Sequence, residues 1–180
     1  MERVKIAPNF YLDEVVDPHT YLKTPEIAMD YGRKVAPMAQ LLRNIISKTV
    51  TINNWWAKYA ALVAKGHSED EIIRQIEKDN GVRKWAGSRP KHCPIGASAS
   101  AHRIERMEGA VDCVVAGMSG KDLFKIVEAK ASDFYDEGVR RIEDFKDAPT
   151  WLHMDKRAIP DRNVIRVVGV KSFVRNIPAS

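Results

Sequence analysis

The stretch VRRIEDFKDAPTWLHMD, residues 139–155, decides the predicted fold. It is predicted to form two strands, VRRIEDF and TWLHMD, joined by a short turn at residues 147–149. Side chains alternate between the two faces of a strand, so His153 and Asp155 should share one face and Leu152 and Met154 the other. One face of this strand thus carries two groups that can bind a metal or a proton.

Three further segments are predicted to be strands. AVDCVV at 110–115 is a compact apolar strand, NVIRVVGV at 163–170 is the last strand, and TVTINNWW at 49–56 is a short strand that runs into a loop. We expect residues after Val174 to form no regular structure.

Helices are predicted mainly in the first half of the chain. Apolar residues recur with helical spacing after Pro37, at Met38, Leu41, Leu42, Ile45 and Ile46. Residues 57–80 are expected to be helical, with a capping-box spacing at Ser68 and Glu71. A second such spacing, Ser119 with Asp122, starts a helix through about Ala131.

Helices followed by a strand-rich half with one inserted helix indicate the α+β class. We therefore predict an α+β fold, a mainly antiparallel sheet with flanking helices. The expected organisation is an N-terminal arm at 1–35, where prolines interrupt any long helix, a single domain at 36–175 and a tail at 176–180.

Composition excludes some classes of protein. The 180 residues are 44% hydrophobic and 29% charged, which fits one soluble domain with a real core. No apolar run approaches the roughly 18 residues of a membrane span, and the charged N-terminus does not resemble a signal peptide. We expect synthesis in the cytoplasm and no membrane insertion. The net charge of +5 could suit nucleic acid, but lysine and arginine are scattered without a binding motif, so no nucleic-acid partner is predicted.

The two cysteines, Cys93 and Cys113, belong to no CxxC pair. A thiolate zinc site is therefore not expected, and both are interpreted as reduced, partly buried thiols.

Three residues are the candidate metal ligands. His102 closes the run SASAH, Asp112 follows within AVDCVV, and His153 lies in WLHMD. Two histidines and one carboxylate are the ligand set of an open catalytic zinc site, which leaves a fourth position for water. Spacing alone does not decide this, because a histidine on an apolar strand is more often a structural residue.

Longer blocks of the chain carry a resemblance. SASAHRIERMEGAVD at 98–112 resembles the Ser-x-His…Ala-x-Asp signature of the D-alanyl-D-alanine carboxypeptidase and hedgehog-type zinc peptidase superfamily. INNWW at 52–56, GSRP at 87–90 and RRIEDF…TWLHMDKR at 140–157 are similar to its phage and bacterial branch, which cleaves peptidoglycan. FYLDEVVDPHTY at 10–21 is similar to the start of such domains, so the resemblance covers roughly residues 10–158.

This resemblance implies that the domain at 36–175 is a single zinc peptidase-like domain with a zinc site at one face of the sheet. His102, Asp112 and His153 match the ligands of a catalytic Zn²⁺, and Arg89 matches the arginine that faces the substrate's peptide carbonyl or carboxylate. The implied activity is zinc-dependent hydrolysis of a peptide bond in peptidoglycan stem peptides. The implied source is a phage or a bacterium, with the protein acting on the cell wall or carried in a virion.

The sequence departs from the family pattern in two places. Residues 103–109 lengthen the link between His102 and Asp112 by about three residues, which a bulged loop can absorb. Thr150 and Trp151 stand where relatives often carry the catalytic base. The remaining candidates for that base are Glu143 and Asp155, and Asp155 is also a candidate for orienting a ligand histidine.

Two other functions remain open from the sequence. A non-catalytic, zinc-stabilised module of the same fold, such as a phage virion or tail component with virion partners, fits the missing base. A basic nucleic-acid binder rests on the net charge alone.

Overall fold

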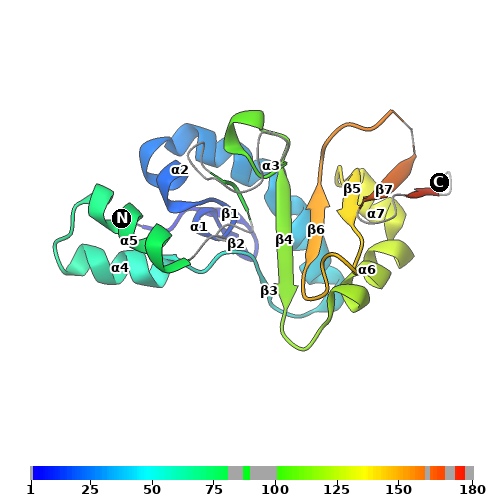
Figure 1. Cartoon of the computed structure of the whole chain (residues 1–180), viewed down its shortest axis with the longest axis horizontal. Coiled ribbons are helices and arrows are strands. Elements are labelled where there is room, and N and C mark those ends of the chain that lie inside the picture. The colour runs from blue at the N-terminus through cyan, green and yellow to red at the C-terminus, as the bar shows by residue number, and fades with distance from the viewer. Residues whose placement is uncertain (1, 81–86, 90–100, 161–162, 169–172, 177–180) are drawn as a thin grey trace.

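The computed structural model describes residues 2–80, 87–89, 101–160, 163–168 and 173–176. Within these residues the chain has an α+β fold, as predicted (Figure 1). The strands are β1 (Lys5–Ala7), β2 (Phe10–Tyr11), β3 (Val50–Thr51), β4 (Ala110–Val115), β5 (Arg141–Glu143), β6 (Leu152–Asp155), β7 (Val164–Val168) and β8 (Phe173–Asn176). The helices are α1 (Leu12–Val15), α2 (Pro18–Lys23), α3 (Pro25–Ile46), α4 (Trp56–Ala64), α5 (Glu69–Asn80), the 3₁₀ turn η1 (Ile104–Arg106), α6 (Gly120–Ala129) and α7 (Ala131–Asp136).

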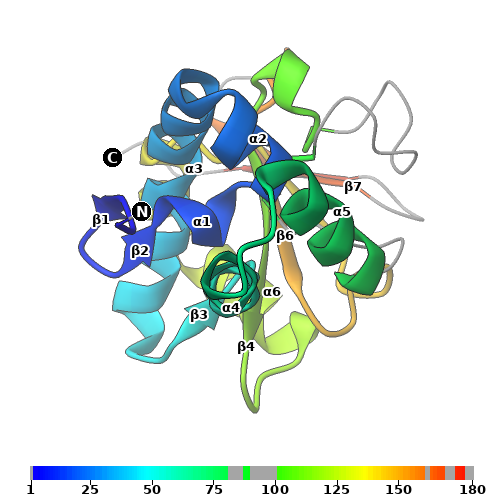
Figure 2. The same cartoon turned by 90° about the vertical axis from the view of Figure 1, so that its left-hand side faces the viewer.

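A six-stranded sheet organises the structure, with strand order β3-β4-β6-β5-β7-β8. Every neighbouring pair is antiparallel except β5 and β7, which run parallel. The prediction of a mainly antiparallel sheet is therefore confirmed. β1 and β2 form a separate two-stranded sheet next to the N-terminal helices (Figure 2).

The sheet has an apolar face and a polar face. Register partners in adjacent strands point to the same side, so the apolar face can be read from the pairings. It consists of buried side chains that share one core with residues of α3, α6 and α7: Val111, Cys113, Val115, Ile142, Leu152, Met154, Ile165 and Val167. The polar face carries six polar side chains at the alternate positions: Asp112, Arg141, Glu143, His153, Asp155 and Arg166.

The long helix α3 starts earlier than predicted. It begins at Pro25 and contains Pro37, so the predicted start at Pro37 is wrong. A proline inside a helix removes one hydrogen bond and costs about 3 kcal/mol, but burial of an apolar stripe that includes Tyr31 and Met38 offsets this cost. The boundary at residue 35 falls inside α3, and Phe10 of the expected arm lies in the same core.

Several local predictions match the structure. The capping boxes at Ser68–Glu71 and Ser119–Asp122 are present, each with the serine hydroxyl accepting a hydrogen bond from the backbone N–H three residues later. The predicted helix at 57–80 is two helices, α4 and α5, separated at Gly66, which has a φ of 79°. The first two residues after Val174, Arg175 and Asn176, belong to β8, which pairs with β7, so the prediction of irregular structure is wrong for them. Residues 177–180 lie outside the described residues.

Among the described residues, no helix is both long enough and apolar enough to cross a membrane.

Candidate metal centre

Two of the predicted ligands are direct neighbours in the sheet. Asp112 of β4 and His153 of β6 are register partners in an antiparallel pair. Their side chains meet on the polar face, where Oδ1 of Asp112 lies 2.7 Å from Nδ1 of His153. The sheet backbone thus fixes a carboxylate and an imidazole at contact distance.

The third ligand comes from the segment just before η1. Arg103 forms a bridge with Arg89, and the Arg89 backbone N–H donates to the carbonyl oxygen of His102 at 2.7 Å. His102 Nε2 lies 3.2 Å from His153 Nδ1 and 3.4 Å from Asp112 Oδ1. The structure therefore brings all three predicted ligands together, and we call His102, Asp112 and His153 the ligand triad.

The geometry of the ligand triad fits a small divalent cation. Tetrahedral coordination at bond lengths of about 2.0–2.1 Å places ligand atoms about 3.3 Å apart. The three donor atoms are separated by 2.7, 3.2 and 3.4 Å, so a single point can lie about 2 Å from each of them. Two imidazoles and one carboxylate also suit the chemistry of zinc, although other first-row metals accept the same donors.

One ring nitrogen of each histidine is held by a hydrogen bond to Gly87 or to Asp155, so the other nitrogens, His102 Nε2 and His153 Nδ1, face each other. His102 Nδ1 lies 2.7 Å from the carbonyl oxygen of Gly87, which can only accept, so Nδ1 carries the proton. His153 Nε2 lies 3.1 Å from Oδ2 of Asp155, so Nε2 carries the proton there. His102 Nε2 and His153 Nδ1 then face each other and a carboxylate oxygen, and a cation bound among them would replace the proton that His153 Nδ1 shares with Asp112.

The charges of the ligand triad also favour a bound cation. Burial opposes ionisation of Asp112, but the neighbouring His102 and His153 lower its pKa. Burial also opposes a charge on His153, yet its hydrogen bonds with Asp112 and Asp155 raise its pKa to about 10. The site therefore keeps the carboxylate ionised with positive charge beside it, which His153 itself carries until a bound cation takes its place.

The side of the site that carries His102 rests on the N-terminal helices. Gly87 packs so closely on the C-terminal end of α1 that an added Cβ would lie 1.9 Å from the Val15 carbonyl oxygen. The next residue, Ser88, donates its hydroxyl to the buried Asp17 at 2.6 Å, and its N–H donates to Val15. Asp17 in turn caps α2 by accepting from the backbone N–H of Thr20.

Arg89 lies at the edge of the ligand triad. Its guanidinium is 4.0 Å from Oδ2 of Asp112, and its side chain is partly exposed. The structure therefore places Arg89 next to the metal ligands, where the resemblance expects a substrate-facing arginine.

Asp155 is fully buried and already held by two partners. It accepts from His153 and from Arg157, whose Nη2 lies 2.6 Å from Oδ2. Burial alone would raise the pKa of Asp155, but these hydrogen bonds lower it to about 2. Its position suits orientation of His153 rather than proton transfer to a substrate.

Glu143 lies on the other side of His153. The β5–β6 register pairs Arg141 with Asp155 and Ile142 with Met154, so its continuation by one residue brings Glu143 toward His153 on the polar face. Burial is the main cause that raises the pKa of Glu143, while the charge of His153 opposes the rise and that of Asp112 adds to it. Of the two carboxylates, Glu143 is thus the partly exposed one near the ligand triad, whereas Asp155 is fully buried.

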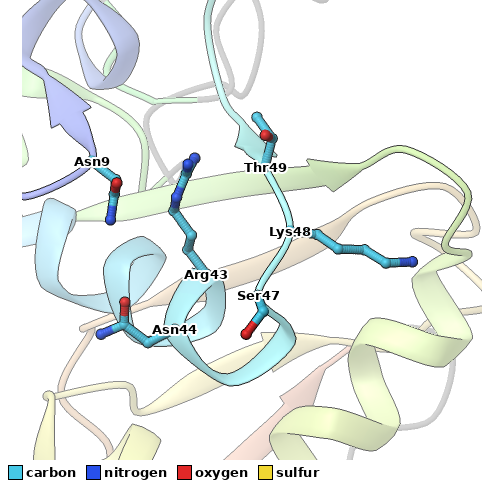
Figure 3. Close-up of a pocket in the computed structure, with 6 residues that line it drawn as sticks. All are labelled: Asn9, Arg43, Asn44, Ser47, Lys48 and Thr49. Atoms are coloured by element: carbon cyan, nitrogen blue, oxygen red, sulfur yellow. The ribbon is translucent and has the colours of Figure 1, made fainter.

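A pocket of about 520 Å³ lies elsewhere, at the C-terminal end of α3 (Figure 3). Its lining is polar and basic and includes no histidine and no carboxylate: Asn9, Arg43, Asn44, Ser47, Lys48 and Thr49. It shares no residue with the ligand triad, so its shape does not bear on the metal centre.

Sequence reasoning missed the supports of the site. The Gly87 carbonyl oxygen that holds His102 is a backbone atom, and the Asp17–Ser88 pair joins residues 71 positions apart. The only signal was the small pair Gly87-Ser88 directly before Arg89. Of the cysteines, Cys113 is buried and reduced on the apolar face, whereas Cys93 lies outside the described residues.

No family model matches this chain, and no curated protein or solved structure is significantly similar to it.

Proposed function

We propose that this domain is a zinc-dependent peptidase that hydrolyses a peptide bond in peptidoglycan stem peptides. The observation that carries the proposal is the convergence of three potential ligand atoms, from His102, Asp112 and His153, within 3.4 Å of one another. Such a set leaves one tetrahedral position open, which is typical of catalytic rather than structural zinc sites. The resemblance of the sequence to peptidoglycan peptidases supplies the substrate class.

Each neighbouring side chain has a role in this proposal. When bound, zinc would polarise the scissile carbonyl and acidify a water molecule. Glu143, partly exposed and close enough to His153 to feel its charge, accepts the proton of the attacking water and returns it to the leaving amine. Arg89, 4.0 Å from Asp112, donates hydrogen bonds to the carbonyl oxygen as negative charge develops on it. Asp155 keeps His153 in the tautomer that leaves Nδ1 unprotonated.

A second function is a non-catalytic module that retains a metal for stability, for example in a phage virion. The observation in its favour is that Thr150 and Trp151 occupy the positions where the family's base is often found, while Asp155 is engaged by His153 and Arg157. A metal held by three ligands still contributes free energy of folding.

One experiment separates the two functions. The purified chain is analysed for bound metals and then incubated with purified peptidoglycan, and the released fragments are mapped by mass spectrometry. The peptidase predicts about one zinc per chain and new peptide termini that a chelator abolishes. Full zinc content with no fragments from any wall type would overturn the peptidase and favour the structural module.

A further inference from the structure

Asp155, the outer partner of His153, is held by a second side chain, that of Arg157. Arg157 lies two residues beyond the end of β6, and its side chain is 20% exposed. Its Nη2 and Nε donate to Oδ2 of Asp155 at 2.6 and 3.1 Å, and its backbone N–H donates to Oδ1 at 3.0 Å. One residue therefore binds both oxygens of this carboxylate.

These hydrogen bonds fix the carboxylate in the orientation that His153 requires. Oδ2, which accepts from the guanidinium of Arg157, is also the oxygen that lies 3.1 Å from Nε2 of His153. Rotation of the carboxylate would break charge-assisted hydrogen bonds at both of its oxygens. Asp155 is fully buried, so water is not at hand to replace a broken bond.

Arg141 is the other arginine beside Asp155, but it makes no such contact. It is the register partner of Asp155 in β5, and its Nε lies 4.0 Å from Oδ2, beyond hydrogen-bond distance. This Nε is buried and has no hydrogen-bond partner among the described residues, and the charges of both Asp155 and Glu108 act on Arg141. Arg157 is thus the arginine that holds the outer partner of the ligand histidine.

We propose that Arg157 is a positioning residue of the metal centre, which acts through Asp155 on the ring of His153. By holding Asp155, Arg157 fixes Nε2 of His153 and thereby keeps Nδ1 directed at Asp112, 2.7 Å away, and at His102, 3.2 Å away. Outer partners that orient a ligand in this way typically change metal affinity by about 10–100-fold. This inference rests on the metal centre of the proposed function, but it concerns metal affinity and not hydrolysis.

A double-mutant cycle tests whether Arg157 acts through Asp155. Competition with a chromophoric chelator measures the zinc affinity of the parent chain, Arg157→Gln, Asp155→Ala and the double variant, after circular dichroism has shown that each is folded. Arg157→Gln should weaken zinc binding by at least about 10-fold. The double variant should bind zinc within about 3-fold of Asp155→Ala alone, because Arg157 has no carboxylate to hold once Asp155 is removed.

Arg140→Gln is the matched control. Arg140 is also a partly buried arginine, but its Nη1 donates to the carbonyl oxygen of Tyr135 at 2.6 Å, so the variant breaks a comparable hydrogen bond that does not involve Asp155. Its zinc affinity should stay within about 2-fold of the parent. The visible absorption bands of the Co²⁺-loaded protein report ligand geometry, and they should shift in Arg157→Gln but not in Arg140→Gln.

The conservative variant separates the fork of Arg157 from its charge. Arg157→Lys keeps the positive charge but cannot donate two parallel hydrogen bonds, so it should recover only part of the zinc affinity. If Arg157→Gln does not fold, Arg157→Lys takes its place in the cycle.

The outcomes distinguish this inference from the proposed function. Parent-like zinc affinity without the arginine fork, or losses that multiply in the double variant, overturns the positioning role even if the protein cleaves peptidoglycan. Coupled losses of zinc affinity in a protein that releases no peptide keep the positioning role and overturn the peptidase. A parent chain that binds no zinc overturns both.

Discussion

The metal centre has a sheet side and a loop side, and the two are held in different ways. On the sheet side, Asp112 and His153 are register partners, so backbone hydrogen bonds of β4 and β6 set their distance. On the loop side, His102 and Arg89 belong to segments outside the long strands and depend on contacts with Gly87 and the α1–α2 region. The sheet alone can present two ligands, whereas the third requires the N-terminal helices to be in place.

This difference gives the N-terminal region a role in the site. Val15 and Asp17 bind Ser88, and Gly87 fits against Val15 only because it has no side chain. Tyr31 of α3 adds a second link, since its hydroxyl donates to the Ala110 carbonyl oxygen and accepts from the Ala110 N–H at the start of β4. Substitutions on the sheet side and on the loop side should therefore differ in their effects on zinc affinity, turnover and stability.

The largest expected effect comes from removing one ligand on each side. His153→Ala and His102→Ala should both lower zinc affinity by more than about 100-fold, because loss of a direct ligand exceeds the usual cost of an outer partner. Elemental analysis and a competition titration with a chromophoric chelator measure this loss. His67→Ala is the control, since His67 is an exposed residue outside the ligand triad. If both triad variants keep full zinc, the ligand assignment is wrong.

Substitution of the two carboxylates on the sheet side, Glu143 and Asp155, should distinguish proton transfer from orientation of the ligand His153. Glu143→Gln keeps the size of the side chain but removes its basicity, so zinc content should stay near one per chain while turnover falls at least about 100-fold. Asp155→Asn should instead weaken zinc binding by about 10–100-fold, because Asp155 orients His153. Both variants are assayed for zinc and for peptidoglycan hydrolysis. Full activity in both would place the base elsewhere.

Substitution of Arg89 tests the loop side and leaves all three metal ligands unchanged. Arg89→Ala should leave zinc content and melting temperature unchanged and reduce turnover by about 100-fold, the scale of one lost oxyanion donor. Arg89→Lys should recover little, since a point charge does not replace a bidentate fork. Parent-like turnover in the alanine variant would remove Arg89 from the mechanism.

The kind of interaction that forms each side of the metal centre decides how much of that side could be predicted from the sequence. Strand alternation placed His153 and Asp155 together, and capping spacings located the helix starts at Ser68 and Ser119, because these are local patterns. The start of α3 was missed because burial outweighs the local cost of Pro37. Local patterns also carry no information on long-range contacts.

The loop side shows what local patterns leave out. The contact of the Gly87 carbonyl with His102 and the Asp17–Ser88 hydrogen bond join distant segments through a backbone atom and a small side chain. The unsatisfied Nε of Arg141 likewise depends on where two other arginines and two carboxylates lie after folding. None of these features has a signature in a single sequence.

The smallest expected effect, and the one that tests the loop side most directly, is that of Gly87→Ala. The new Cβ would lie 1.9 Å from the Val15 carbonyl oxygen, a backbone atom that cannot rotate away, so the segment must shift. Overpacking of this kind costs about 1–3 kcal/mol of stability. Because the Gly87 carbonyl fixes the ring of His102, the shift should also weaken zinc binding, by about 10-fold.

Gly66→Ala is the matched control for that variant. Gly66 has a φ of 79° with nothing near its position for a Cβ, so alanine there should cost about 1–2 kcal/mol through backbone strain alone. Thermal unfolding measures the loss of stability in both variants, and chelator competition measures their zinc affinity. Weaker zinc binding in Gly87→Ala, with unchanged binding in Gly66→Ala, ties the metal centre to the contact between Gly87 and Val15. Equal zinc affinity in both would mean that the sheet side positions His102 without help from the N-terminal helices.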